Sequence, residues 1–498
     1  MIRLDRKFLY ALFTLGVSLI WGLRLFIEWG SDFGSYYAHS YFFDESFILY
    51  NDAFSHKGPL YYLFISILGK IIGWGPWQAY LTLVITLLFF YIPIIFILYR
   101  RVSDLTGLVI MVISLVLLDN QDTNSSISLF QGGFLFLSFF YLLQSIATIE
   151  NIRRDKYLIS VSFFICAILV RIDALMYAPI FLIAIVMSSI NRKSLKLFFE
   201  RIIQGLAAFI VLYSLNQIYF GYSIFDFYIH NVEFNLLYNQ GGNPSILDYI
   251  VRPLHFSLLM NSGVILLFLL VLILKHDDFI QKSNNRIFNM ILNNNDAQQY
   301  LISLFIVLTG TVFWIMTGSE KNYHVFIIAI PLLFFVAFWG ERLNKISNKL
   351  KLVSAPILLY MLMLTTGPGL MTVMKYRNCL TDTFCTDSPI YLYKKTVEKI
   401  SQQESATIIG GRGWTYFFAN TKPETAISDW WMYYRKETFV SQYLLDGHEK
   451  LMNQSSGYEF WIDNEMLNGD ERSDYFYELI NNAEFIIDEG RYSRYMIK

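Results

Sequence analysis

Phe43-Asp44-Glu45-Ser46 and, within the same connection, His56-Lys57-Gly58-Pro59-Leu60-Tyr61-Tyr62 stand between the first two long apolar segments of this chain. Two adjacent carboxylates are followed by a basic pair and then by an aromatic turn. Charged side chains are expensive where a chain meets the lipid bilayer, so they usually mark a functional site there. The rest of the sequence tells whether this connection lies at a membrane surface.

The composition is that of an integral membrane protein. Hydrophobic residues make up 55% of the chain, aromatic residues 18% and charged residues 16%, whereas soluble proteins average about 25% charged residues. The net charge of −1 gives no electrostatic basis for binding nucleic acid. We expect no cleavable signal peptide, because Phe8–Ile27 is long enough to span and no small-residue cleavage site follows it.

Apolar segments of spanning length recur along the chain. The hydrocarbon core of a bilayer is about 30 Å thick and needs roughly 20 apolar residues per helix. By that measure we expect about eleven membrane spans, at residues 8–27, 78–98, 105–119, 128–149, 157–170, 174–190, 202–220, 255–274, 300–317, 323–340 and 351–374.

Lysine and arginine are distributed unevenly between the connections, which predicts the orientation. With the N-terminus in the cytoplasm, the cytoplasmic connections carry the basic clusters Arg100 and Arg101; Arg153, Arg154 and Lys156; Arg192, Lys193 and Lys196; Lys275, Lys282 and Arg286; Arg342, Lys345 and Lys349. The connections at 44–62, 171–173, 221–254 and 318–324, together with the C-terminal tail, then lie outside the cytoplasm.

The composition of the chain changes from apolar to polar after Met374, so we predict a transmembrane domain at 1–374 and a second domain at 375–498. The second is polar, with helical patterning at 390–402 and 470–481 and strand-like segments at 406–409, 458–462 and 484–488. Alternating strands and helices predict a small extracytoplasmic α/β domain. It either binds the acceptor of a reaction or braces the membrane part.

The connection at 221–254 is rich in aromatic residues and too long for a bare loop. Aromatic side chains favour the membrane interface, so we expect a segment that lies on the membrane beside a substrate entrance.

Three cysteines are present. Cys166 falls inside a span, where packing is the expected role. Cys379 and Cys385 follow the last span on the side where oxidation is permitted, and we predict a disulfide between them. Two free thiols are the alternative, because spacing does not establish the geometry of a bridge.

The ionisable residues of the extracytoplasmic connections form a one-sided set. They are Asp44, Glu45, His56, Lys57, Asp122, Arg171, Asp173, Lys321 and His324. A carboxylate can act as general base toward a hydroxyl, and basic side chains can hold a phosphate and stabilise a leaving group. The set therefore suits transfer from a phosphorylated lipid.

Several of these residues also have a purely structural interpretation. Asp44 and Glu45 can simply solvate a loop, and His56 and Lys57 can anchor the interface with their apolar stems. Arg171 and Asp173 can pair to cap the sixth span. Arg412 lies in a glycine turn that is either a strand-to-helix turn or a loop facing the substrate. The sequence has no Gly-rich phosphate loop and no Gly-x-Ser-x-Gly nucleophile turn.

The first connection resembles that of the membrane glycosyltransferases of the GT-C class. The likeness is closest to the protein O-mannosyltransferase and lipid A aminoarabinose transferase branch, whose Asp-Glu pair precedes a Lys-Pro-Pro-Leu type of turn. Here Asp44-Glu45 precedes Lys57-Gly58-Pro59-Leu60, with glycine at the first proline. Leu169–Leu175 followed by Pro179, and Lys321–His324 followed by Pro331, resemble two later segments of these enzymes.

The resemblance implies a GT-C-like fold in a bacterial inner membrane and inverting transfer of one hexosyl or pentosyl unit. The donor would be a polyprenyl-phosphate-linked sugar and the acceptor an extracytoplasmic glycan such as lipopolysaccharide O-antigen, a lipid or a protein. Some GT-C enzymes use a divalent metal, for which the sequence shows no ligand cluster. Two alternatives stay open: an O-antigen polymerase or ligase, and a non-enzymatic transporter of lipid-linked sugars.

The resemblance also assigns roles by matching position. Asp44 is the expected catalytic base, and Glu45 shapes the acceptor site beside it. His56, Lys57, Arg171, Lys321 and His324 are expected around the donor phosphate. Asp122, Asp173 and Arg412 are expected to support the site or the acceptor.

Overall fold

The computed structural model describes residues 6–27, 31–43, 48–50, 55, 57–101, 107, 110–111, 114, 125–146, 154–191, 194–233, 295–317, 326–340, 371, 374, 394–402, 405–409, 416, 419–420, 422–423, 442–467, 474–488 and 492–498. The chain divides into two compact units. The first contains Met1–Leu23, Leu83–Ser214 and Pro244–Met371, and the second contains Arg24–Thr82, Leu215–Asn243 and Thr372–Lys498.

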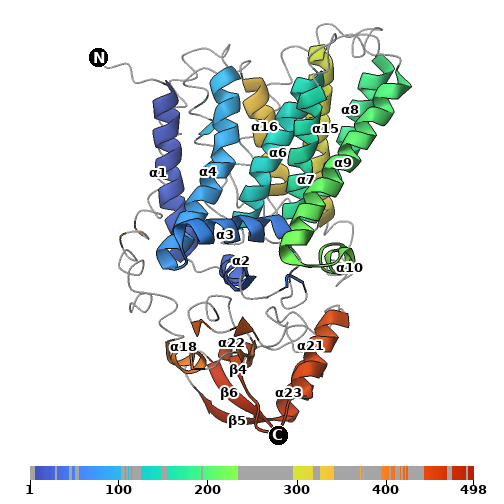
Figure 1. The fold of residues 1–498 in the computed structure, drawn as a ribbon. Coiled ribbons are helices and arrows are strands. Elements are labelled where there is room, and N and C mark those ends of the chain that lie inside the picture. Colours follow the sequence, from blue (N-terminus) through green and yellow to red (C-terminus); the bar gives the residue numbers. More distant parts are fainter. Residues whose placement is uncertain are drawn as a thin grey trace. The chain divides into compact units, whose positions relative to one another are not determined.

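The first unit is a bundle of apolar helices (Figure 1). Most of its residues belong to α1 (Arg6–Ile27), α4 (Pro76–Arg101), α6 (Ser125–Ile146), α7 (Arg154–Val170), α8 (Ala178–Asn191), α9 (Leu195–Phe220), α15 (Asn295–Thr317) and α16 (Phe326–Trp339). By length and composition, three described helical stretches are able to cross a membrane: Pro76–Arg101, Ser126–Ile146 and Ala297–Trp314.

These helices coincide with eight of the expected spans. The span expected at 174–190 begins two residues early, as the 3-10 helix η2 (Ile172–Tyr177), and continues as α8. The spans expected at 105–119, 255–274 and 351–374 lie almost entirely outside the described residues. The total of about eleven stays a prediction.

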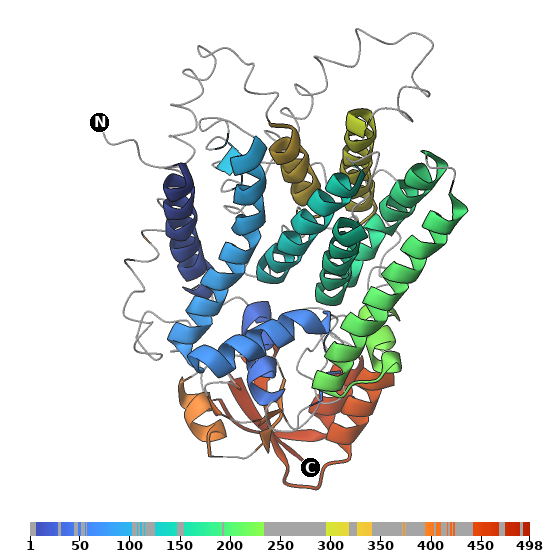
Figure 2. The ribbon, with the colours of Figure 1, turned by 45° about the horizontal axis from the view of Figure 1, so that its top comes forward.

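Small and hydroxylated residues bring the helices of the bundle together. α6 and α7 lie side by side in two views (Figure 1 and Figure 2), where Ser138 Oγ donates to the Ser160 carbonyl at 2.9 Å and Ser160 Oγ donates back at 2.7 Å. Between α15 and α16, a Cβ on Gly310 would lie 2.7 Å from Pro331 Cγ. Such close approach of backbones is how helices associate in lipid, where apolar burial gives little drive.

The first connection, expected to be a loop over 44–62, contains helical structure. α2 (Ser31–Phe42) precedes Asp44, and α3 (Pro59–Ile72) begins inside the quoted motif. Pro59 is the first residue of α3, a position where proline costs no hydrogen bond and presets φ. Tyr36 of α2 then packs edge-on against Tyr61 and Tyr62 of α3, with ring centroids 5.6 Å apart in both cases.

The C-terminal part of the second unit is a small α/β structure, as predicted. β2 (Ile408–Ile409), β4 (Glu459–Asp463), β6 (Tyr492–Ile497) and β5 (Ala483–Asp488) form a sheet in that order, β2 parallel to β4 and the other pairs antiparallel. β1 (Ser405–Ala406) and β3 (Lys422–Pro423) pair separately. The described helices here are α18 (Lys394–Ile400), α21 (Gln442–Met452), α22 (Asn464–Leu467) and α23 (Asp474–Asn481).

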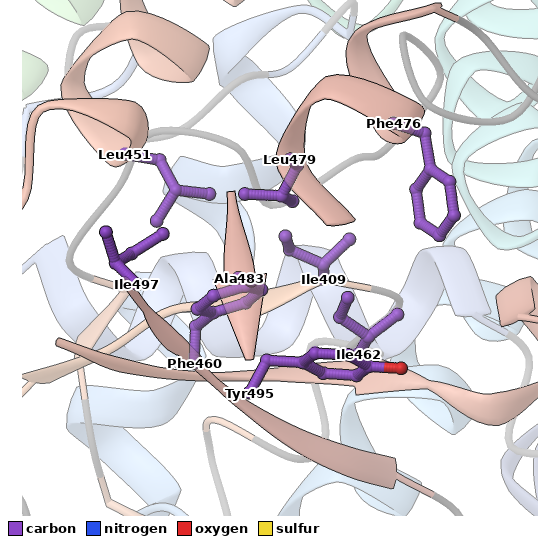
Figure 3. Packing of buried hydrophobic residues seen from close by; sticks show 9 residues of the cluster. All are labelled: Ile409, Leu451, Phe460, Ile462, Phe476, Leu479, Ala483, Tyr495 and Ile497. Carbon is purple, nitrogen blue, oxygen red and sulfur yellow. The ribbon is translucent and has the colours of Figure 1, made fainter. Parts of the chain in front are cut away.

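One face of this sheet forms a hydrophobic core with α21 and α23. Figure 3 shows its members, Ile409, Leu451, Phe460, Ile462, Phe476, Leu479, Ala483, Tyr495 and Ile497. Phe460 and Tyr495 are paired across β4 and β6 and stack with centroids 5.9 Å apart. The sequence analysis missed β6 and α21, although β6 lies in the middle of the sheet.

Candidate functional site

Three of the predicted site residues are described by the structure: Lys57 in the second unit, and Arg171 and Asp173 in the first. The others lie outside the described residues, and their roles stay predictions. They are Asp44, Glu45, His56, Asp122, Lys321, His324 and Arg412, together with the predicted disulfide partners Cys379 and Cys385.

Lys57 is buried, with 7% of its surface exposed, and its backbone is held on both sides. Tyr50 Oη donates to the Lys57 carbonyl at 2.7 Å, and the Lys57 amide donates to Ser55 Oγ at 3.1 Å. Ser55 Oγ in turn shares a hydrogen bond of 2.5 Å with Tyr62 Oη of α3. These bonds fix the position from which the lysine side chain departs.

The backbone of Gly58 has the conformation that a proline at this position would impose. Its φ of −69° and ψ of 158° fall where a proline ring locks φ, near −65°. The following Pro59 also favours this extended conformation at position 58. The turn after Lys57 therefore has the backbone conformation that a Lys-Pro-Pro sequence would impose.

Tyr50, which holds Lys57, has an unusual backbone. Its φ is 71°, in the left-handed region that a bulky side chain adopts only where its surroundings enforce it. The ring is fully buried and stacks on His230 with centroids 5.1 Å apart. Tyr222 meets the same ring edge-on at 5.2 Å.

His230 belongs to the connection predicted to lie on the membrane. This connection begins with α10 (Ile224–Tyr228), capped reciprocally by Ser223 and Asp226, and continues as the π-helix η3 (Ile229–Glu233). Burial lowers the pKa of His230 to about 4, although Asp226 and hydrogen bonds with the backbone of Ser55 and Tyr50 act in the opposite direction. The imidazole is therefore neutral near pH 7.

The described part of this connection is helical and packs on the Lys57 segment through His230. The rest, 234–254, lies outside the described residues, so a position on the membrane stays a prediction. Sequence analysis missed Tyr50 and His230 as site residues. Both connections were recognised as aromatic, but nothing in their spacing indicated that they meet.

Arg171 lies at the start of η2, and both of its terminal nitrogens have partners. Nη2 is 2.7 Å from Asp173 Oδ2, and Nη1 donates to Ser128 Oγ of α6 at 2.6 Å. The side chains of Arg171 and Asp173 are 12% and 17% exposed. The ion pair expected by the structural interpretation is therefore present, and it is largely shielded from water.

Gln131 completes this cluster. Its Nε2 donates to Asp173 Oδ1 at 2.7 Å and lies 3.0 Å from the Arg171 carbonyl. Ser128 and Gln131 are three residues apart in α6, so they present polar groups on one face of an apolar helix. That spacing is the signal in the sequence from which a polar face on α6 can be predicted. A hollow of about 10 Å³, room for one water molecule, opens between this cluster and Ile327 and Ile330 of α16.

The two clusters offer different chemistry. Lys57 is a buried cation on a fixed backbone. Such a cation suits the binding of an anion in a site from which water is excluded. Arg171 is a cation whose plane is set by a carboxylate and a hydroxyl. Within the described parts of the chain, no three His, Cys, Asp or Glu side chains gather closely enough to hold a metal ion.

Neither a protein-family model nor a curated protein sequence matches this chain. Among solved structures it is similar to ArnT from Cupriavidus metallidurans bound to undecaprenyl phosphate, with a TM-score of 0.57 and 12% identity over 98% of this chain and 97% of that one. For the apo state of the same ArnT, the TM-score is 0.52 and the identity 13%, with the same coverage. The predicted resemblance is confirmed as a common fold: over nearly its whole length, this chain has the fold of ArnT.

Proposed function

We propose that this protein is a membrane glycosyltransferase that moves a single sugar from a polyprenyl-phosphate carrier to an extracytoplasmic acceptor. One observation carries the proposal: the fold matches, over 98% of the chain, that of an ArnT whose structure holds undecaprenyl phosphate. The motif Asp44-Glu45 with Lys57-Gly58-Pro59-Leu60 supports it independently, because it places a carboxylate and a cation in one short connection.

Asp44 is the proposed general base. It takes the proton of the acceptor hydroxyl while that oxygen attacks the anomeric carbon of the donor sugar on the face opposite the phosphate. The new glycosidic bond forms as the bond to the phosphate oxygen breaks, so the configuration inverts. The polyprenyl phosphate leaves with the electron pair. Glu45, adjacent to the base, shapes the acceptor site.

Lys57 and Arg171 are proposed to stabilise the charge on the leaving phosphate, together with His56, Lys321 and His324. The burial of Lys57 and the bonds on its carbonyl and amide support this role. A cation that is already fixed in a water-excluded site stabilises developing charge without reorganisation. Asp173 and Ser128 set the plane of the Arg171 guanidinium in the same way.

The acceptor is proposed to be a component of the bacterial envelope: a cell-surface glycan such as lipopolysaccharide O-antigen, a lipid or a protein. Asp122, Asp173 and Arg412 are proposed to support the site or the acceptor. The enzyme would lie in the inner membrane with its N-terminus in the cytoplasm, a catalytic domain at 1–374 and a periplasmic domain at 375–498.

The test is transfer from undecaprenyl-phosphoryl sugars by the purified full chain in lipid nanodiscs, with an envelope lipid extract as acceptor. Removing a general base slows catalysis by about 10²–10⁴-fold, and we expect Asp44→Asn to lower kcat to that extent. Glu484→Gln, an exposed carboxylate on β5, is the matched control and should leave kcat unchanged. Full activity of Asp44→Asn would contradict the assignment.

The same assay separates the alternatives. Addition of one sugar to the acceptor supports the proposal, whereas ladders of repeat units indicate a polymerase or ligase. Movement of the intact carrier across vesicles that contain no acceptor indicates a transporter.

A further inference from the structure

Tyr50 links two connections that are far apart in the sequence. Its hydroxyl donates to the carbonyl of Lys57 at 2.7 Å, and its ring stacks on His230 of η3. The position of the Lys57 backbone therefore depends on a tyrosine, and the position of that tyrosine depends on the π-helix. All these residues belong to the second unit.

The conformation of Tyr50 is costly, which argues against simple core filling. A bulky residue at φ 71° is a genuine backbone outlier, and such residues persist only where the surroundings over-determine them. Here His230, Tyr222 and Phe227 surround the ring at centroid distances of 5.1, 5.2 and 6.4 Å. An ordinary packing position would be filled by an aromatic residue in an extended or helical conformation.

The partner on the π-helix side is also unusual. π-helical turns are rare and occur frequently at functional sites, and η3 places His230 against Tyr50 with only 2% of the histidine exposed. The neighbouring helix α10 exposes Ile224 and Phe225, both at 66%. The segment thus has one face on Tyr50 and another that is largely exposed in the described part of the chain.

We propose that Tyr50 and His230 are positioning residues for Lys57. In this arrangement η3 holds the ring of Tyr50, and the Tyr50 hydroxyl holds the carbonyl of Lys57, so that the ammonium group is presented to an anionic phosphate. The proposal rests on the function proposed above, because it takes Lys57 as a contact of the donor phosphate.

The experiment measures the affinity of the purified full chain in nanodiscs for undecaprenyl phosphate. Tyr50→Phe removes the hydrogen bond to Lys57 and keeps the ring, and we expect an affinity about five- to tenfold weaker. Tyr37→Phe is the matched control, since Tyr37 is equally buried in the same unit and its hydroxyl donates to the Gly75 carbonyl at 3.2 Å. It should bind as the wild type does.

A double-mutant cycle distinguishes positioning from general destabilisation. Lys57→Ala weakens binding, and adding Tyr50→Phe to it should cost nothing further, because the tyrosine acts only through the lysine. Transfer kinetics give a second measure: a misplaced Lys57 binds the donor phosphate less tightly and so raises KM for the donor, and it also lowers kcat because it stabilises the charge on the leaving phosphate less well. Loss of folded protein would lower the maximal rate at an unchanged KM.

His230 supplies an independent pair of variants if Tyr50→Phe does not fold. His230→Ala removes the ring beneath Tyr50 and should weaken binding, whereas His230→Phe retains an aromatic ring and should restore most of it. Equal affinity in Tyr50→Phe and Tyr37→Phe, or additive losses with Lys57→Ala, would overturn the inference. A wild type that does not bind undecaprenyl phosphate, or a Lys57→Ala variant that binds normally, would instead overturn the proposed function.

Discussion

Replacing Asp173 by asparagine tests the ion pair at the start of η2. Asparagine has the same shape and can still accept the hydrogen bond from Gln131, but it no longer carries the charge that balances Arg171. The two charged side chains are 12% and 17% exposed and lie 2.7 Å apart. The substitution therefore leaves a guanidinium largely shielded from water and without its counter-charge.

The expected cost follows from that burial. Removing one partner of a buried ion pair costs about 3–5 kcal/mol, and the residual exposure and the retained hydrogen bond reduce it. We expect a loss of about 2–3 kcal/mol in the local free energy of opening. Glu459→Gln is the matched control, because Glu459 pairs with Arg494 at 2.9 Å but the two side chains are 33% and 24% exposed. That pair should contribute less than about 1 kcal/mol.

Hydrogen exchange is the suitable assay, since the chain has two compact units and a single unfolding free energy is not defined for it. Peptides that cover η2 report on Asp173→Asn, and peptides that cover β4 and β6 report on Glu459→Gln. The reasoning would be refuted if η2 lost no more protection in Asp173→Asn than the strands lose in Glu459→Gln. Undecaprenyl phosphate should restore more protection at η2 in Asp173→Asn than in the wild type, because its phosphate can supply the missing counter-charge.

Three further predictions concern other parts of the chain. Gly58→Pro should stabilise the start of α3 by about 0.4–1 kcal/mol, because position 58 already has a proline conformation; lower protection of α3 from hydrogen exchange would contradict this. Gly310→Ala should destabilise the bundle by about 1–3 kcal/mol, because the new Cβ would lie 2.7 Å from Pro331 Cγ and 2.9 Å from the Ile327 carbonyl; unchanged resistance to SDS would refute the close contact. Burial lowers the pKa of His39 to about 4, below the value near 6.5 of an unfolded chain. Its contribution to stability is therefore complete above about pH 6.5 and decreases as the pH falls toward 4, by about 2 kcal/mol at pH 5. The protection of α2 from hydrogen exchange, corrected for the intrinsic exchange rate, should differ less between pH 7 and pH 5 in His39→Gln than in the wild type.

The spans were predictable because lipid imposes a simple rule on them. α4, α6 and α15 follow directly from the length of apolar sequence that a bilayer requires. The sequence does not predict α3, because Pro59 and the charges before it are typical of a loop. The same proline is in fact a favourable first residue of a helix.

The missed strand in the C-terminal part has a different cause. β6, Tyr492–Ile497, mixes Arg494 and Ser493 with aromatic residues, so its sequence does not alternate cleanly. It was not recognisable because tertiary partners decide its pattern: Arg494 is paired with Glu459, and Ser493 donates to Asn464. Strand preference depends on such neighbours more than on the residue itself.

The candidate site shows the same division between local and long-range information. Lys57 and Arg171 were predictable as site residues from the local sequence. A charged side chain near the bilayer is energetically costly, so its presence indicates a function. The sequence did not identify Tyr50, Gln131 or His230, because an aromatic or amide side chain in a membrane protein needs no special explanation. Their importance lies in what they hold: the Lys57 carbonyl, the Asp173 carboxylate and the Tyr50 ring. An exchange that preserves those contacts, such as Gly58→Pro, should leave the geometry intact. An exchange that breaks them, such as Tyr50→Phe, should therefore do more harm than its mild chemistry suggests.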